Sequence, residues 1–125
     1  MATVIKTDLP NPVYSGKVRD TYSLGEDHFL MIATDRISAF DVVLPNGVPD
    51  KGAVLAQISL FWFDLTKNLI PNHLEKFAMD RTDLDLDNEI ARRAMVVRKA
   101  DRIDVECVVR GYITGSAWNE YLKEG

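Results

Sequence analysis

Cysteine is nearly absent from this sequence of 125 residues, which contains only Cys107. One cysteine cannot build an intrachain disulfide framework. It lies in an apolar stretch between Glu106 and Val108 with no histidine nearby, so we expect a buried, inert thiol rather than a nucleophile. The two histidines, His28 and His73, lie far apart without cysteine partners, which argues against a zinc site.

Long apolar runs and an excess of positive charge are also missing. No run approaches the roughly 20 residues that cross a bilayer, and residues 1–10 contain no apolar core of a signal peptide. Fifteen Lys and Arg against 19 Asp and Glu give a net charge of −4, which argues against a nucleic-acid partner. We therefore expect a cytoplasmic protein with neither a membrane nor a nucleic-acid partner. A composition of 46% hydrophobic and 27% charged residues is typical of one globular domain.

The first half of the sequence predicts strands and then a helix. Residues 13–15, 19–23 and 28–33 have strand-like patterns separated by turn residues, which indicates an antiparallel meander. A helix is predicted from about residue 53 until shortly before Pro71, because one face collects the apolar residues Leu55, Ile58, Trp62, Leu65 and Leu69. Trp62 and Trp118 are most simply interpreted as core residues.

The second half is predicted to be more irregular. We expect an acidic, turn-like region at 76–88, a short helix at 89–94, and strands at 95–99 and 105–110. A last helix is predicted from Ser116, whose hydroxyl suits an N-cap. Together these elements indicate an α+β fold, an antiparallel sheet lobe with packed helices.

Three segments have the residue types of a phosphate or carboxylate site. The turn Gly16-Lys17-Val18-Arg19-Asp20 combines a glycine with cations that could face phosphate oxygens, although a plain hairpin turn with surface cations fits as well. The loop 34–41 gathers two carboxylates, an arginine and a serine, and it could equally be a solvated connection. The same alternatives hold for Pro49-Asp50-Lys51-Gly52, which also fits a turn into the long helix.

A fourth segment, 109–116, is the most specific of them. An apolar run ends in Arg110, two glycines allow close backbone approach, and Ser116 begins a helix whose N-terminus favours anions. This combination predicts an anion pocket. The alternative is a glycine-bent loop with a surface salt bridge.

Four motifs follow one another along the chain: Gly16 to Asp20, Ala33 to Asp41, Pro49 to Gly52, and Glu106 to Trp118. In this order they resemble the phosphoribosylaminoimidazole-succinocarboxamide synthase (SAICAR synthetase) family. Each is weak alone, but the ordered set covers nearly the whole chain and is specific. One departure is Asp104, where the family commonly has proline before the glutamate of the last motif.

The resemblance implies an ATP-dependent ligase of purine synthesis with a kinase-like nucleotide-binding lobe. Its small-molecule partners would be ATP, L-aspartate and carboxyaminoimidazole ribonucleotide, and its cofactor would be Mg²⁺. The γ-phosphoryl group would pass to the ribonucleotide's carboxylate, and the amine of aspartate would displace it from the acyl phosphate. No protein nucleophile is needed.

The resemblance also implies a role for each matching position. ATP would contact Gly16, Lys17, Val18 and Arg19 through its phosphates, and the connection 97–102, including Lys99, Asp101 and Arg102, through its adenine. Arg110, Gly115 and Ser116 would bind the substrate's 5′-phosphate, and Arg36 would also contact the substrate. Asp35, Ser38, Asp41 and Lys51 would line the place where the reactants meet.

Family members extend well beyond the last motif and include an acidic segment, Asp-x-Lys-x-Glu-Phe-Gly, which does not occur here. We therefore expect residues 1–125 to be the N-terminal part of such a protein, with a strand-rich lobe at about 1–100 and the start of a second lobe at about 101–125. No metal ligand is assigned in this chain, because the magnesium ligands would come mainly from the absent half. Alone, it would be inactive and would self-associate as a homo-oligomer through an uncovered apolar face. A non-catalytic nucleotide-binding module and a plain interaction domain remain the alternatives.

Overall fold

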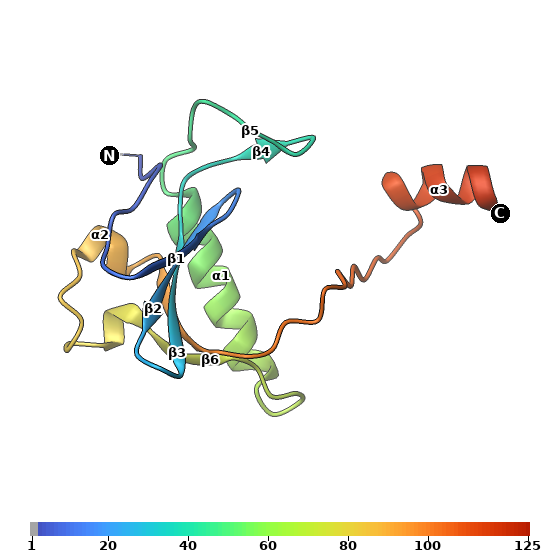
Figure 1. Ribbon diagram of the computed structural model, residues 1–125. Coiled ribbons are helices and arrows are strands. Elements are labelled where there is room, and N and C mark those ends of the chain that lie inside the picture. The colour runs from blue at the N-terminus through green and yellow to red at the C-terminus, as the bar shows by residue number, and fades with distance from the viewer. Residues whose placement is uncertain (1–2) are drawn as a thin grey trace.

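A five-stranded antiparallel sheet forms the centre of the fold. The computed structural model describes residues 3–125, and Figure 1 shows the arrangement of its elements. The strand order is β1-β2-β3-β7-β6, with β1 (Pro12–Ser15), β2 (Arg19–Leu24), β3 (His28–Ala33), β7 (Ala94–Arg98) and β6 (Leu74–Phe77). The α+β class and the antiparallel meander are confirmed. The turn-like prediction for 76–88 was wrong at its start, because Lys76 and Phe77 pair with β7.

Burial alternates along β2 and most of β3, whereas four consecutive residues of β7 are buried. Strands β2 and β3 pair from Arg19 opposite Ala33 to Leu24 opposite His28. Ile32 and Val96 are fully buried, because they lie on the covered face of two paired strands. This continuous core holds the ends of β2 and β3, from which the candidate site extends.

Helix α1 (Lys51–Thr66) packs on the sheet through its small residues. Gly52, Ala53 and Ala56 are buried, and the helix contacts β3 and β7. A Cβ at residue 52 would lie 2.1 Å from the carbonyl oxygen of Ala33, so only glycine permits this approach. The helix and its end before Pro71 are confirmed.

The apolar stripe that predicted α1 points mostly away from the sheet. Its five residues are all exposed: Leu55, Ile58, Trp62, Leu65 and Leu69. The core interpretation of Trp62 was therefore wrong. Helical spacing showed that these side chains share a face, but the small residues of α1 come closest to the sheet and decide which face is buried.

The shorter elements lie in the connections between β3 and α1 and between β6 and β7. Hairpin β4 (Ser38–Ala39) and β5 (Val42–Val43) precedes α1, while the 3-10 helix η1 (Ala78–Asp80) and helix α2 (Asn88–Ala91) lie between β6 and β7. The short helix expected at 89–94 is thus confirmed, although it starts and ends earlier. Asp87 caps it by accepting the N–H of Glu89 at 2.7 Å.

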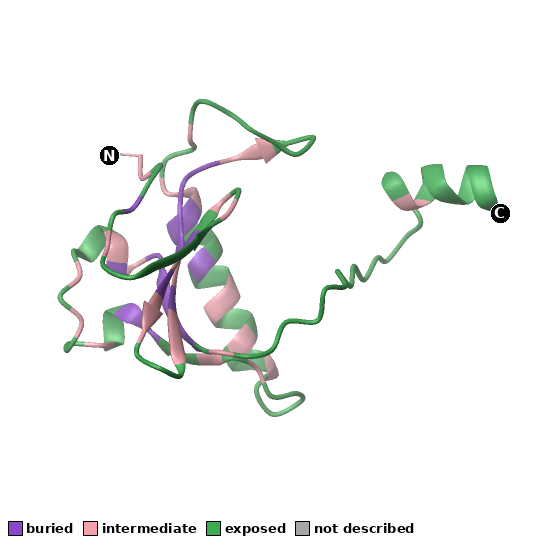
Figure 2. Cartoon of the chain, viewed as in Figure 1, coloured by how far each residue is buried: buried purple, intermediate pink, exposed green. Residues whose placement is uncertain are grey.

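Residues 101–125 extend away from the sheet and end in helix α3 (Ser116–Glu124), as Figures 1 and 2 show. The helix is confirmed. The strand predicted at 105–110 was wrong, because no neighbouring strand pairs with its backbone within residues 3–125. Since apolar side chains there have nothing to pack against, Cys107 is exposed, contrary to expectation. Trp118 is exposed for the same reason, so its core interpretation was also wrong.

Ser116 is not the N-cap of α3. Gly115 occupies that position, and Ser116 is the first helical residue. Its hydroxyl instead contacts Arg110. No helix within the described residues 3–125 is long and apolar enough to cross a membrane.

Candidate functional site

The predicted phosphate turn contacts the predicted substrate loop directly. Lys17, between β1 and β2, forms an ion pair with Asp41 of the β4–β5 hairpin. A hydrogen bond from Lys17, followed by its charge, lowers the pKa of Asp41, and the same contact raises the pKa of Lys17. Lys17 and Asp41 lie 24 residues apart in two different motifs, and their ion pair therefore connects the two motifs.

The β4–β5 hairpin is unusual at its tip. Its two connecting residues, Phe40 and Asp41, both have positive φ, 50° and 65°. This conformation suits the right-handed twist of a hairpin but normally selects asparagine and glycine. The Phe40 side chain is fully exposed. Such strain is concentrated at functional sites in proteins, so the tip is a candidate part of the site.

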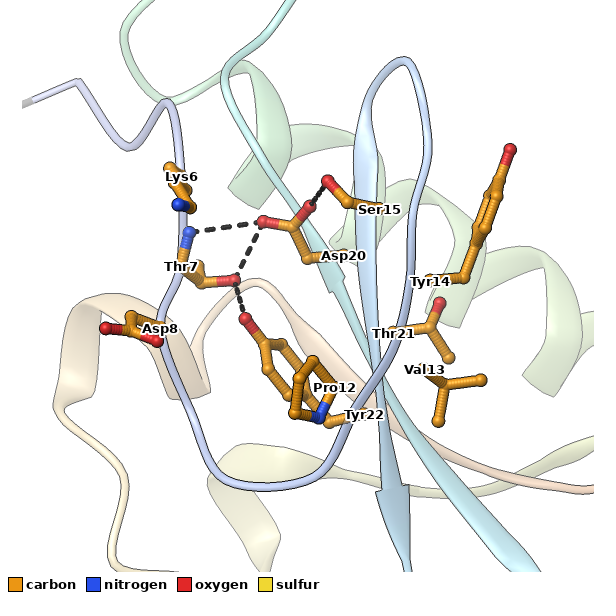
Figure 3. A pocket seen from close by; sticks show the side chains of 10 residues that line it. All are labelled: Lys6, Thr7, Asp8, Pro12, Val13, Tyr14, Ser15, Asp20, Thr21 and Tyr22. Atoms are coloured by element: carbon orange, nitrogen blue, oxygen red, sulfur yellow. Dashed lines mark hydrogen bonds between the residues drawn. The ribbon is translucent and has the colours of Figure 1, made fainter.

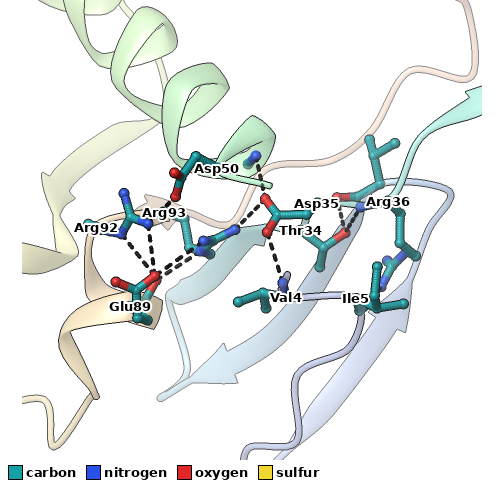
Figure 4. A network of polar contacts seen from close by, with 11 residues as sticks. Val4, Ile5, Thr34, Asp35, Arg36, Asp50, Glu89, Arg92 and Arg93 are labelled. Carbon is teal, nitrogen blue, oxygen red and sulfur yellow. Dashed lines mark hydrogen bonds and ion pairs between the residues drawn. The ribbon is translucent and has the colours of Figure 1, made fainter. Parts of the chain in front are cut away.

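Asp35, which is predicted to line the place where the reactants meet, is fully buried. Its carboxylate accepts the N–H of Val4 at 2.8 Å, the N–H of Gly52 at 2.9 Å and Nη1 of Arg93 at 2.6 Å (Figure 4). Burial alone would raise the pKa of Asp35, but these donors lower it. Asp35 thus joins the N-terminal segment, the start of α1 and Arg93, the residue just before β7.

Arg93 is the partner that sequence reasoning missed. It is completely buried, and its Nε donates to the carbonyl of Glu89 at 2.8 Å. Nη2 has no hydrogen-bond partner within residues 3–125, although the Glu89 carboxylate lies 3.5 Å away. Nothing in the sequence distinguished Arg93 from the adjacent Arg92, which pairs with Asp50 and Glu89 near the surface.

Arg36 is held by Asp20 in a second buried pair. Nη2 and Nη1 donate to the two carboxylate oxygens of Asp20 at 2.8 and 3.3 Å. Figure 3 shows that Asp20 also accepts from Thr7 and Ser15. Burial alone would raise the pKa of Asp20, but Arg36, Ser15 and Thr7 together lower it to about 2. Thr7, Ser15 and Asp20 of this network line part of a neighbouring cavity of about 320 Å³.

Ser38 and Lys51 flank the hairpin and the start of α1. Ser38 belongs to β4 and is half-buried, while Lys51 is the first residue of α1 and is also half-buried. The backbone N–H of Lys51 donates to Val48 at 3.1 Å. Both residues come later in the chain than Asp35, whose buried contacts fix the position of its own segment.

The predicted adenine connection is mostly exposed. The ammonium of Lys99 lies 5.0 Å from the ring centre of Phe29 and donates to the carbonyl of Gly25 at 3.0 Å. Asp101 is exposed, and Arg102 pairs with Asp104 at 2.7 Å. Of the two segments that this connection joins, only the first, β7, is a strand.

Arg110 and Ser116 lie together at the start of α3. Nη2 of Arg110 donates to Oγ of Ser116 at 3.2 Å, and Nη1 donates to the carbonyl of Thr114 at 3.4 Å. Between them Gly115 takes a left-handed φ of 62°. Every hydrogen bond that residues 101–125 form with described residues stays inside that segment.

A comparison with known sequences decides the family. The profile of SAICAR synthetase matches residues 12–125. The chain belongs to the SAICAR synthetase family. The resemblance found in the sequence motifs is thereby confirmed.

Relatives in the family agree in sequence and in structure. Phosphoribosylaminoimidazole-succinocarboxamide synthase of Syntrophotalea carbinolica is 48% identical over 98% of this chain and 43% of its own length. The enzyme of Thermodesulfovibrio yellowstonii is 53% identical over 88% of this chain and 38% of its own length. A solved SAICAR synthase of Saccharomyces cerevisiae, complexed with SAICAR, superposes with a TM-score of 0.86 at 41% identity, covering 98% of this chain and 46% of that one.

A more distant member extends the comparison to a nucleotide. A type-2 SAICAR synthetase in complex with ADP has a TM-score of 0.57 at 25% identity, over 70% of this chain and 33% of its own. The chain thus spans less than half the length of these relatives. Within residues 3–125, no group of three His, Cys, Asp or Glu side chains is arranged to hold a metal ion.

Proposed function

We propose that this chain provides the ATP-binding turn and the phosphate-binding arginine of a ligase that joins L-aspartate to carboxyaminoimidazole ribonucleotide. The products would be SAICAR, ADP and phosphate, in purine biosynthesis. The family match over residues 12–125 carries this proposal. Relatives bound to SAICAR and to ADP support the two ligand classes.

The reaction needs activation of a carboxylate, which is a poor acylating agent. One carboxylate oxygen attacks the γ-phosphorus of ATP, the bond to the ADP oxygen breaks, and an acyl phosphate forms. The neutral amine of aspartate then attacks the acyl carbon, loses a proton and expels phosphate. Positioning and charge neutralisation supply most of the catalysis in such transfers.

Gly16, Lys17, Val18 and Arg19 would surround the phosphates of ATP. The ammonium of Lys17 is already paired with the carboxylate of Asp41. On ATP binding, a phosphate oxygen would take the place of that carboxylate oxygen. We assign Ser38, Asp41 and Lys51 to the meeting place of the reactants.

Asp35 would act on the reaction through structure, because its three buried contacts leave no oxygen exposed. It would fix the start of the hairpin segment relative to α1. Lys99, Asp101 and Arg102 stay assigned to the adenine side.

Arg110, Gly115 and Ser116 stay assigned to the 5′-phosphate. A planar guanidinium can meet two phosphate oxygens at once, and the start of α3 adds free N–H groups. The contact from Arg110 to Ser116 supports this assignment, because both groups already converge.

We propose that the magnesium ligands of this reaction come mainly from the part of the longer relatives that this chain does not cover. We therefore propose that residues 1–125 alone bind ATP and the ribonucleotide but do not turn over. A coupled assay of ADP release with ATP, magnesium, aspartate and ribonucleotide tests this. Aspartate-dependent turnover by this chain would contradict it.

The ATP assignment is tested by Lys17→Ala, measured by calorimetric titration. Loss of a charged hydrogen bond should weaken ATP binding by about 10-fold or more. Adenosine, which has no phosphates, should bind as before. Lys67→Ala is the matched control, because Lys67 is an exposed lysine that pairs with Asp64 on α1. Equal losses for ATP and adenosine would remove the phosphate turn from the proposal.

A further inference from the structure

Three consecutive carbonyl groups of the turn between β1 and β2 point into the protein. The carbonyl oxygens of Gly16 and Lys17 accept Nη2 and Nε of Arg36 at 2.8 and 3.2 Å. The carbonyl oxygen of Val18 accepts both the N–H and the Oγ1 of Thr34 at 2.9 Å. Thr34 and Arg36, which follow β3, thus bind three consecutive carbonyl groups of the turn.

This arrangement fixes the direction of two N–H groups. In a trans peptide, the N–H points opposite to the carbonyl of the preceding residue, and no peptide bond among residues 3–125 is cis. Since the carbonyls of Gly16 and Lys17 face Arg36, the N–H groups of Lys17 and Val18 face away from it. Neither N–H donates to any acceptor within the described part of the chain. Adjacent free N–H groups of this kind suit an anion.

Arg36 has no donor left for a ligand of its own. A guanidinium has five N–H groups. Here they meet five acceptor contacts: two with Asp20 and one each with the carbonyls of Ile5, Gly16 and Lys17. The side chain is only 10% exposed. A direct substrate contact, as the family resemblance implied, would require Arg36 to give up one of these bonds.

We infer that Arg36 and Thr34 are positioning residues for nucleotide phosphate. They hold the Gly16–Val18 backbone so that the N–H groups of Lys17 and Val18, together with the Lys17 ammonium, face the phosphate chain of a nucleoside triphosphate. Asp20 keeps the Arg36 fork in place, because its two oxygens fix the guanidinium plane. This inference rests on the proposed ATP site and adds the residues that shape it.

Two variants with matched controls test the inference. Thr34→Val removes one hydrogen bond to Val18 with little change in shape, and Thr34→Ser keeps the hydroxyl. Arg36→Lys keeps a positive charge beside Asp20 but cannot reproduce the five-donor fork. Circular dichroism and thermal unfolding first establish that each variant folds. If Arg36→Lys does not fold, Thr34→Val against Thr34→Ser carries the test.

The first measurement is the ratio of ATP to adenosine affinity. Thr34→Val should lower ATP affinity by about 2- to 10-fold, since a neutral hydrogen bond contributes modestly. Arg36→Lys should lower it by about 10-fold or more, and adenosine affinity should stay unchanged for both. Thr34→Ser should restore the ratio. A merely structural role would weaken ATP and adenosine alike.

The second measurement needs no ligand and separates this inference from the proposed function. The N–H of Gly16 donates to Arg19 across the turn at 2.7 Å, so its hydrogen exchange reports the order of the turn. Exchange at Gly16 should accelerate at least about 10-fold in Arg36→Lys, while exchange at Val96 in the core stays slow. Unchanged exchange at Gly16, or an unchanged ATP-to-adenosine ratio, would overturn the inference. If the unaltered chain itself fails to prefer ATP over adenosine, the proposed function fails as well.

Discussion

Arginine side chains hold both the sheet region, residues 3–98, and the extended segment, residues 101–125, but in opposite environments. Arg93 and Arg36 are buried and bonded to buried carboxylates. Arg110 and Arg102 are exposed and bond only to groups a few residues away. The first pair joins distant parts of the chain, and the second pair shapes only local loops.

This difference separates architecture from binding. A buried arginine that loses its carboxylate leaves an uncompensated charge, so breaking such a pair strongly destabilises the fold. An exposed arginine remains solvated and can exchange its partner for a ligand at little cost. Arg110, with a hydroxyl and a carbonyl as its present partners, is therefore suited to receive a phosphate. Arg36 is suited to support a binding turn.

The largest effect should follow from removing Arg93. Arg93→Ala leaves the Asp35 carboxylate buried without its counter-ion, and we expect a loss of about 3 to 5 kcal/mol in the free energy of unfolding. Arg102→Ala, the exposed counterpart, should change it by about 0 to 1 kcal/mol. Urea unfolding followed by circular dichroism measures both. Similar losses would mean that burial does not distinguish the two regions.

A middle-sized effect should appear on acidification. The folded-state pKa of Asp20 is about 2, below its ordinary value of 3.8, so its stabilising contribution is complete above pH 4 to 5. That contribution is lost as the pH falls through about 2. The gap corresponds to about 2 kcal/mol in the free energy of unfolding.

The Asp20→Asn variant checks the origin of this loss. It should be less stable at neutral pH, but its unfolding free energy should fall less steeply between pH 5 and pH 2. Urea titrations at each pH give the slope. An identical slope in both proteins would assign the acid sensitivity to other carboxylates, such as Asp35, whose pKa is also lowered.

The smallest effect on folding should come from Arg110→Lys. An exposed substitution should change the unfolding free energy by less than about 0.5 kcal/mol. Affinity for the carboxylated ribonucleotide should nevertheless fall by about 10- to 100-fold, because lysine cannot contact two phosphate oxygens in one plane. Ser116→Ala should cost less. Unchanged affinity in a calorimetric titration with Arg110→Lys would require another phosphate site.

Local patterns predicted the elements of the sheet region well. Alternation in β2 and β3 and the turn residues between them fixed an antiparallel pairing that depends on near neighbours. The same reasoning failed at residues 105–110, where the apolar pattern was suitable but residues 3–125 contain no partner strand. Strand β6 was missed because its pairing with β7 joins residues about 20 positions apart.

The sequence predicted the motifs of the candidate site but not the residues that hold those motifs in place. The phosphate turn and the substrate loop were identified by residue type, and the contact between Lys17 and Asp41 agrees with their grouping. Asp20 and Thr34 lie inside two of the motifs, but sequence reasoning assigned neither a role of its own, and Arg93 lies outside every motif. Their importance depends on partners 16 to 58 positions away along the chain.

The sequence by itself determined the strand meander, the long helix and the four ordered motifs of the family, because each depends on residues close together along the chain. Tertiary structure alone decided which face of α1 is buried and which arginines are enclosed. It also decided that the Gly16–Val18 carbonyls face Arg36 and Thr34. These outcomes depend on close approach and burial between distant segments, where one glycine or one enclosed carboxylate outweighs the local pattern.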